Sequence, residues 1–187
     1  MSPYFFGYGS LVNRATHSYG EAEPAQLAGW RRVWVHTAVR PLAYLSVERD
    51  ADCTIQGLIA HVPNGDWAAL DLREHGYGRH LAEARSTGGN RPIQVYAVPM
   101  RQAGAPAVAH PILLSYIDVV IQGFLREFGA AGAASFFATT HGWDAPIFDD
   151  RAAPQYPRAQ PLTQAEQAVV DAGLAGVGAV VRGATGR

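Results

Sequence analysis

Short runs of β-branched and aromatic residues, each closed by glycine, proline or a polar turn, dominate the first half of the chain. Runs of this kind are typical of strands, and no regular alternation of strand and helix is visible among them. The predicted strands are Tyr4–Phe6, Arg32–Thr37, Thr54–Val62 and Ile93–Val98. Gly57 interrupts the third run and indicates a bulge or a close backbone approach. This part of the chain therefore predicts a closed or strongly curved sheet.

Helical patterns appear mostly later in the sequence. The first predicted helix, 64–75, ends at Gly76. The second, 111–128, opens with proline, carries apolar residues three and four positions apart and ends at Gly129. The segment from Thr163 to Glu166 has the pattern of a capping box and opens a third helix, which later glycines weaken. Strands early and helices late predict an α+β fold with a small mixed β-barrel-like sheet and flanking helices.

The length of 187 residues corresponds to about one domain. We expect a main domain over residues 1–160 and a helical segment over 161–187 that packs on the same domain. The proline-rich stretch Pro154–Pro161 is the best candidate for an extended connector between them. No internal repeat is visible, and no feature of the sequence fixes an oligomeric state.

Composition excludes several classes of chemistry. The chain has no lysine, which rules out Schiff-base catalysis and a phosphate-binding loop lysine. Fifteen basic and sixteen acidic residues give a net charge of −1, so a broad footprint for nucleic acid is absent. The single cysteine, Cys53, cannot form an internal disulfide, and the seven histidines show no metal-ligand spacing. We expect no metal, no cofactor and no nucleic-acid partner.

Targeting signals are also missing from the sequence. The N-terminal stretch has no basic leader, and its apolar part is too short for a signal peptide. The longest run of small apolar residues, Gly173–Val181, is much shorter than a membrane span. The expectation is a soluble, cytoplasmic protein without a membrane partner.

Two segments combine residues that carry chemistry. In the first, Phe6–Leu11, a strand runs into Gly7 and Gly9, followed by Ser10. Glycines allow a sharp turn whose successive amides bind a carboxylate or an oxyanion. The segment fits neither a dinucleotide fingerprint nor a nucleophile elbow, because Val12 stands where each pattern needs a different residue. Without a ligand, the same residues make an ordinary turn after a strand.

The second segment, 70–77, places Asp71, Arg73, Glu74 and His75 at the end of a predicted short helix. On a solvated face this is an ordinary charged helix end. A carboxylate near a helix C-terminus has a raised pKa, which is the direction that a general acid/base needs at neutral pH. Arg73 lies one residue before Glu74 and is expected to point elsewhere on the helix, in a structural role.

Together these segments resemble the gamma-glutamylcyclotransferase family. The family's Y-G-S-L turn corresponds to Tyr8–Leu11, and its D-x-R-E segment with a nearby G-Y corresponds to Asp71–Glu74 and Gly76–Tyr77. Gly29–Arg32 looks like the family's entry to an early strand. The residues from Ser115 to Phe124 look like the late helix of the glutathione-directed, ChaC-type branch, although Val12 and Asn13 stand where that branch often has an aromatic residue.

The resemblance implies an enzyme that needs no cofactor. In this family the α-amine of a gamma-glutamyl substrate attacks its own γ-carbonyl, which releases 5-oxoproline and an amine. By resemblance, Glu74 is the catalytic acid/base. Tyr8, Gly9, Ser10 and Leu11 would bind the gamma-glutamyl end, and Tyr116 is a further substrate contact or a core tyrosine. Replacement of Gly9 by valine is expected to impair binding if the turn needs a positive φ or a close approach.

Three alternatives remain open on the sequence. The substrate can be glutathione, a gamma-glutamyl amino acid or a gamma-glutamyl amine. A non-catalytic module on the same fold would bind a small metabolite without turning it over. A nucleic-acid-binding barrel is a third possibility, which the balanced charge disfavours.

Overall fold

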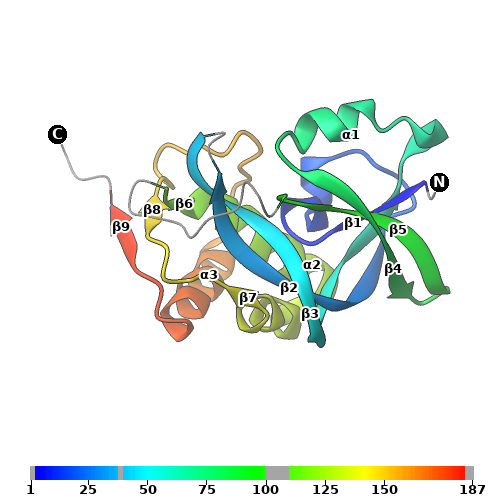
Figure 1. The fold of residues 1–187 in the computed structure, drawn as a ribbon. Helices are drawn as coiled ribbons and strands as arrows, with labels where there is room; N and C mark the ends of the chain where they lie inside the picture. The colour runs from blue at the N-terminus through cyan, green and yellow to red at the C-terminus, as the bar shows by residue number, and fades with distance from the viewer. Residues whose placement is uncertain (1–2, 38–39, 100–109, 184–187) are drawn as a thin grey trace.

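The computed structural model describes residues 3–37, 40–99 and 110–183. Five strands close into a barrel: β1 (Tyr4–Gly7), β2 (Glu23–Thr37), β3 (Arg40–His61), β4 (Gly78–Ser86) and β5 (Gly89–Ala97). They follow the order β3-β1-β5-β4-β2, and pairing of β2 with β3 completes the ring. Strand β1 runs parallel to β5, and the other barrel pairs are antiparallel. The predicted α+β class with a small mixed barrel is confirmed (Figure 1).

Strand β1 shows how alternation builds two cores. Because successive side chains point to opposite faces of a strand, Phe6 enters the barrel core and Phe5 points to the other side. Phe5 belongs to a second apolar cluster with Trp67, Leu70 and Tyr96, next to helix α1 (Ala68–Arg73). Both phenylalanines are buried, as expected for core residues.

Strands β2 and β3 form one long hairpin that serves two purposes. Near its start β2 pairs with β4, and near its end it pairs with β7 (Thr140–His141). The register shifts between Ala28 and Trp30, where Gly29 has a φ of +76°. Ala25 and Leu27 are buried before the shift, and Trp30, Arg32 and Trp34 are buried after it. The irregularity at Gly29 therefore lets one strand serve both the barrel and its extension.

Strand β4 was not predicted from the sequence. Its nine residues read Gly-Arg-His-Leu-Ala-Glu-Ala-Arg-Ser, and Ala84 is the one residue among them that is fully buried. A strand that exposes most of its side chains lacks the apolar periodicity on which strand prediction depends. The predicted close approach at Gly57 is confirmed: a Cβ there would lie 2.5 Å from Cζ of Phe6 and would overlap the carbonyl of Gly7.

The helix predicted over 64–75 is shorter in the structure. A 3-10 turn, η3 (Pro63–Gly65), precedes α1, and Asn64 within it has a φ of +56°. The left-handed backbone at Asn64 and Gly65 prevents a continuous helix. Gly76, with a φ of +96°, lies just after α1, consistent with the predicted glycine stop.

Helix α2 (Leu114–Ala138) begins later and ends later than predicted. Residues before it form the short strand β6 (Ile112–Leu113), so the helix does not start at Pro111. Gly129 interrupts the helix with φ +67° and ψ −167°, and a further helical segment follows. The predicted stop is thus a kink. Ile117 and Ile121, from the predicted apolar face, are completely buried against the barrel core.

The C-terminal part packs against α2. Helix α3 (Gln164–Gly176) opens with the predicted capping box, in which Thr163 and Glu166 bond each other's backbone amides. Val170 and Leu174 of α3 join the main apolar cluster. A parallel sheet of β6, β8 (Ile147–Asp149) and β9 (Val181–Gly183) lies beside this helix pair (Figure 1). Residues 184–187 of the expected C-terminal segment lie outside the described residues.

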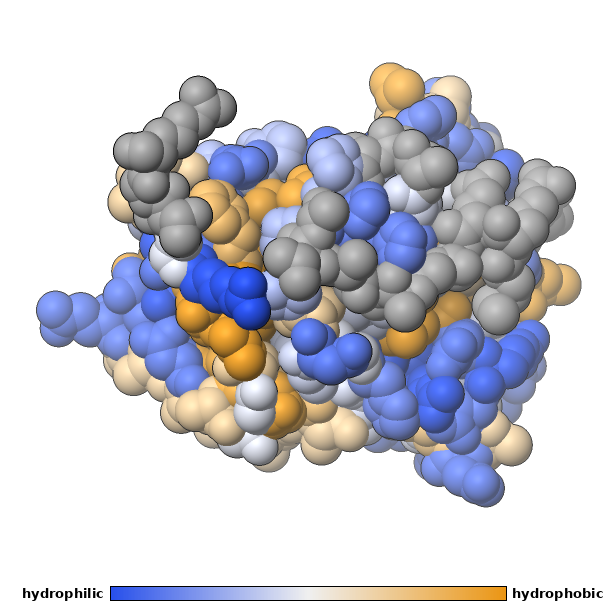
Figure 2. All heavy atoms as spheres, turned by 60° about the vertical axis from the view of Figure 1, so that its left-hand side comes forward, coloured by the Kyte–Doolittle hydropathy of each residue, from blue (hydrophilic) through white to orange (hydrophobic). Residues whose placement is uncertain are grey.

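None of the helices in the described part of the chain is long and apolar enough to cross a membrane. On the side of the molecule that carries the C-terminal sheet, apolar atoms show between hydrophilic side chains (Figure 2).

Candidate active site

The glycine turn after β1 is held in place by a buried arginine. The Nε of Arg32 donates to the carbonyl of Tyr8 at 2.9 Å, and its terminal nitrogens donate to the Gln56 carbonyl and the Thr139 hydroxyl. The guanidinium lies 4.9 Å from the ring centroid of Phe124, and burial lowers its pKa to about 9. Arg32 therefore fastens the turn to the barrel wall through carbonyl and hydroxyl partners.

Gly9 lies close to a side chain of helix α2. Its φ is −126°, so the positive φ considered from the sequence is not present. A Cβ at this position would lie 2.5 Å from the hydroxyl oxygen of Tyr116. That hydroxyl also accepts a hydrogen bond from the Ser10 backbone. The close approach brings the turn and helix α2 together at one point.

Glu74 follows α1 as its C-terminal cap, with φ −91° and ψ +31°. Its side chain is 18% exposed. Burial raises the pKa of this carboxyl, whereas the positive charges of Arg73 and Arg158 oppose the rise. The carboxyl group thus has the raised pKa that the sequence led us to expect, and desolvation is the main cause.

Arg73 corrects one expectation. It was expected to point away from Glu74, but its Nε lies 3.2 Å from the Glu74 carboxylate. Its terminal nitrogens donate to the Thr16 carbonyl at 2.8 Å and to the Ser10 hydroxyl at 3.3 Å. The expectation failed because Glu74 is no longer helical, so the rule that adjacent helical residues diverge does not apply.

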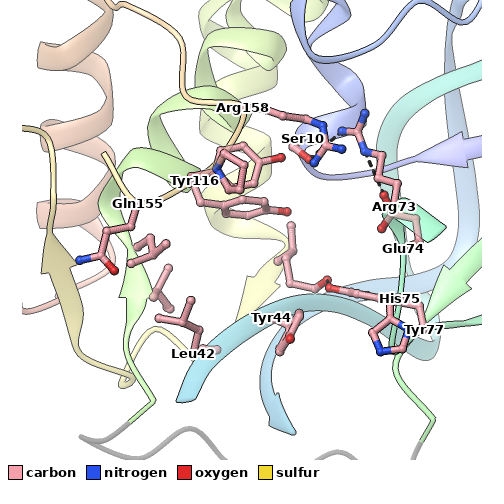
Figure 3. A pocket seen from close by; sticks show the side chains of 16 residues that line it. Ser10, Leu42, Tyr44, Arg73, Glu74, His75, Tyr77, Tyr116, Gln155 and Arg158 are labelled. Carbon is pink, nitrogen blue, oxygen red and sulfur yellow. Dashed lines mark hydrogen bonds and ion pairs between the residues drawn. The ribbon is translucent and has the colours of Figure 1, made fainter. Parts of the chain in front are cut away.

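The residues proposed from the sequence meet at two adjoining cavities of about 150 and 30 Å³. A single water needs only about 10–15 Å³ of such space. Both cavities are lined by Ser10, Leu45, Glu74, Tyr77 and Tyr116, while Tyr8, Gly9 and Leu11 line the smaller one. Figure 3 shows Glu74 and Arg73 beside Ser10, with Tyr116 across the larger cavity. The structure therefore brings all six sequence-proposed positions to one place.

The hydroxyls around the cavity differ in their freedom to act. Tyr8 donates to the Tyr96 carbonyl at 2.6 Å, and Tyr77 donates to the Leu45 carbonyl at 2.9 Å. The Ser10 hydroxyl accepts from Arg73, which leaves its proton for another acceptor. Ser10 and Tyr116 are therefore two hydroxyl donors that a ligand can use.

Sequence reasoning missed two parts of the wall. Tyr77 belongs to the quoted G-Y motif, yet it was given no role, and it lines both cavities. Gln155–Arg158, within the predicted connector, line the larger cavity. Their signal in the sequence was the cluster of prolines around an aromatic and a basic residue.

Metal and thiol chemistry find no support at this site. The described residues hold no group of three or more histidine, cysteine, aspartate or glutamate side chains arranged to bind a metal ion. Burial raises the pKa of the Cys53 thiol, which disfavours the reactive thiolate. The arrangement is one buried carboxylate with nearby cations and hydroxyls, suited to moving protons.

No protein-family model and no curated protein matches the chain by sequence. A solved structure described as a gamma-glutamyl cyclotransferase is similar with a TM-score of 0.60 and 12% identity, covering 92% of this chain and 99% of that one. An uncharacterized protein from Homo sapiens is similar with a TM-score of 0.59 and 12% identity, covering 91% and 98%. YkqA from Bacillus subtilis is similar with a TM-score of 0.57 and 18% identity, and the match covers 75% of this chain and 56% of the YkqA chain.

These likenesses extend over nearly the whole chain for the first two structures. The chain has a gamma-glutamylcyclotransferase-like fold.

Proposed function

We propose that the protein is a gamma-glutamylcyclotransferase-type enzyme, which converts a gamma-glutamyl compound into 5-oxoproline and a free amine. One observation carries the proposal: the mostly buried Glu74 carboxylate lines the same cavities as the Tyr8–Leu11 turn and Tyr116. The fold likeness to a gamma-glutamyl cyclotransferase supports the same reaction.

The reaction needs a folded substrate more than a reactive protein group. Nucleophile and electrophile belong to one molecule, and holding them in contact contributes about 7–11 kcal/mol to lowering the barrier. The cavity between α2, the turn and α1 is the place where the gamma-glutamyl chain bends back on itself. No covalent intermediate with the protein is needed.

Glu74 moves the protons. Its carboxylate takes a proton from the α-ammonium, and the freed amine attacks the γ-carbonyl carbon. Of the three ammonium protons, one stays on the ring nitrogen of 5-oxoproline and two reach the departing nitrogen as its bond to carbon breaks. A single carboxylate that accepts and returns protons in turn contributes about 10²–10⁴-fold to the rate. The amine leaves as an ammonium ion.

Ser10 and Tyr116 stabilise the oxygen of the γ-carbonyl as it becomes negative. Both hydroxyls face the cavity beside Glu74 and keep a proton to donate. Donors fixed before the reaction act strongly in a site that excludes water. Tyr8 and Tyr77, whose hydroxyls are bonded to backbone carbonyls, shape the wall around them.

Replacement of Glu74 by glutamine tests the proposal. Glutamine keeps the shape of the side chain and cannot take a proton, so release of 5-oxoproline should fall by about 10²–10⁴-fold. The measurement is 5-oxoproline formed from glutathione, a gamma-glutamyl amino acid and a gamma-glutamyl amine. Glu83→Gln is the matched control, because Glu83 is exposed on β4 and, among the described residues, its carboxylate accepts a hydrogen bond from Asn90 alone. Undiminished turnover by the Glu74 variant, or binding without turnover by the wild type, would contradict the proposal.

A further inference from the structure

We propose that Arg158, supplied by the segment after β8, binds the α-carboxylate of the substrate. The inference rests on the proposed function and adds a residue that the two recognised motifs do not contain. Arg158 is half-buried and lines the larger cavity together with Ser10, Arg73 and Glu74. Figure 3 shows its side chain reaching toward Ser10 and Arg73.

The segment that carries Arg158 is held at its start by helix α2. Asp150 accepts hydrogen bonds from the Ser115 amide at 2.8 Å and the Ser115 hydroxyl at 2.6 Å, and also from the Gln155 amide at 2.8 Å. The Ser115 hydroxyl in turn accepts from the Tyr156 amide. Asp150 and Ser115 are both buried, so these bonds are protected from water.

Two further contacts hold the middle and the end of the segment. The ring of Tyr156 packs edge-on against that of Tyr116, with centroids 5.0 Å apart and an angle of 88°. Beyond Arg158, the side chain of Gln122 donates to the Pro161 carbonyl at 2.9 Å. Arg158 is thus presented to the cavity by a chain fixed on both sides, which lowers the entropic cost of binding a ligand.

The guanidinium of Arg158 is a positively charged group at the cavity whose hydrogen-bond donors are unused. Within the described residues, its carbonyl accepts a bond from Gln160, and no hydrogen bond or ion pair involves its guanidinium. By contrast, Arg73 already bonds Thr16, Ser10 and Glu74. A guanidinium with unused donors binds a carboxylate through two parallel hydrogen bonds. Of the two arginines at this wall, Arg158 is the one available for an anion.

The charges of the cavity also favour an anion. Arg73, Arg158 and Glu74 share one wall, and both cations are close enough to lower the pKa of the carboxyl. With Glu74 ionised the three groups sum to one positive charge, and a substrate carboxylate balances it. Two guanidinium groups on one wall repel each other until an anion lies between them.

The α-carboxylate fits this position better than a carboxylate on the leaving group. The α-amine must reach Glu74 to lose its proton, and the α-carboxylate is attached to the same carbon atom as that amine. Arg158 and Glu74 lie at the same end of the cavity in Figure 3, while Leu42 and Gln155 lie toward the other end. The leaving group therefore extends toward the end away from Arg158.

The test compares Arg158→Gln and Arg158→Lys with the wild type on paired substrates. One pair is a gamma-glutamyl amino acid and its α-carboxamide, which lacks the α-negative charge. A third substrate is gamma-glutamyl ethylamide, whose leaving group carries no carboxylate. Arg85→Gln is the matched control, because Arg85 is exposed on β4 and lines neither cavity. Thermal unfolding of each variant is measured alongside.

For Arg158→Gln we expect KM to rise about 10- to 100-fold on the free acid and on the ethylamide, with a smaller change in kcat. On the α-carboxamide, Arg158→Gln should have the same KM as the wild type. Arg158→Lys should recover part of the affinity for the free acid. Thermal unfolding should stay unchanged, since the guanidinium bonds no residue that the structure describes. An unchanged KM on the free acid overturns the proposal, as does a rise confined to substrates whose leaving group has a carboxylate.

Failure of the proposed function would look different. In that case the wild type and Arg85→Gln release no 5-oxoproline from any of these compounds. Calorimetric binding of 5-oxoproline and of 2-pyrrolidinone, its analogue without a carboxylate, then decides the role of Arg158. Tighter binding of 5-oxoproline that is lost in Arg158→Gln supports the carboxylate site, and equal binding of both compounds overturns it.

Discussion

At the scale of single residues, the site depends on the balance around the Glu74 carboxyl. Burial raises its pKa, and Arg73 at 3.2 Å together with Arg158 limits the rise. A general base works best when its pKa is near the working pH, whereas a carboxyl that stays protonated cannot accept a proton. The ion pair with Arg73 keeps the group ionisable despite its burial, so Arg73 tunes the pKa of Glu74.

The pH dependence of activity follows from this balance. In the proposed reaction Glu74 acts as a base in its ionised form, so kcat/KM should fall as pH decreases through its raised pKa. This acidic limb should lie above the pH range of an ordinary glutamate. Arg73→Met removes the opposing charge and should move the limb to higher pH. Rates measured from pH 4 to pH 9 test this, and a limb that does not move would contradict the role given to Arg73.

The raised pKa of Glu74 makes stability depend on pH in the opposite direction to activity. Folded Glu74 holds its proton more tightly than the unfolded chain does, so its contribution to stability is lost as pH rises from the unfolded to the folded pKa. At neutral pH, Glu74→Gln should therefore be at least as stable as the wild type in urea unfolding. A clear loss of stability would show that the carboxylate supports the fold.

A prediction at Gly9 distinguishes a steric clash with a neighbouring side chain from backbone strain. A Cβ would collide with the Tyr116 hydroxyl at 2.5 Å, while the Tyr116 Cζ is 3.7 Å away. Gly9→Val should therefore lower turnover at least tenfold, and Gly9→Ala should do so less severely. The Tyr116→Phe background should relieve part of the Gly9→Ala defect. An equal Gly9→Ala defect in both backgrounds would show that the hydroxyl is not the obstacle.

At the scale of elements, the segment between β8 and α3 is a structural part of the site. It has no regular secondary structure, yet Asp150, Ser115 and Gln122 hold it against α2. Arg151 adds a pair of hydrogen bonds to Asp118 of the same helix, at 2.8 and 2.7 Å. One helix thus positions both Tyr116 and the residues opposite it.

Removal of Asp150 tests this arrangement. Asp150→Ala leaves the Ser115 and Gln155 amides without their acceptor, and each unpaired donor costs about 1–3 kcal/mol. We expect a loss of about 3 kcal/mol in the free energy of unfolding and a higher KM, because Arg158 is no longer held in place. Urea unfolding and steady-state kinetics provide the measurements. Asp144→Ala, at an exposed aspartate, is the control. An unchanged KM would show that the segment between β8 and α3 does not contribute to substrate binding.

At the scale of the whole molecule, barrel closure depends on close approach at one glycine. Gly57 pairs with Ala25 of β2 and lies beside Gly7 of β1, where the site turn begins. A methyl group there would overlap the Gly7 carbonyl and approach the Phe6 ring to 2.5 Å. The barrel wall and the glycine turn therefore share this contact.

Gly57→Ala should destabilise the protein by about 1–3 kcal/mol, the usual cost of overpacking a dense core. Gly20→Ala is the matched control, because a Cβ at Gly20 meets no atom within 4 Å. Urea unfolding compares the two variants. Equal stability of both would mean that the barrel can widen at Gly57 without cost.

Local patterns were sufficient for much of the fold. The phenylalanines of β1, the capping box at Thr163 and the close approach at Gly57 were all predicted, because each depends on neighbouring residues or on one backbone property. Strand β4 was not predicted because its side chains are mostly exposed and show no apolar periodicity. The start of α2 was misplaced because Ile112 and Leu113 pair with β8, a partner far along the chain.

The sequence by itself determined the strand-rich barrel class, the glycine turn and the two motif segments, since these are written in local residue order. The tertiary structure alone decided that Glu74 is mostly buried, that Arg73 turns back to pair with it, and that Arg158 reaches the same cavity. Desolvation and ion pairing arise from residues that are distant in the chain and close in space. For that reason the pKa of the carboxyl, and the cation left unpaired beside it, follow from packing and not from any motif.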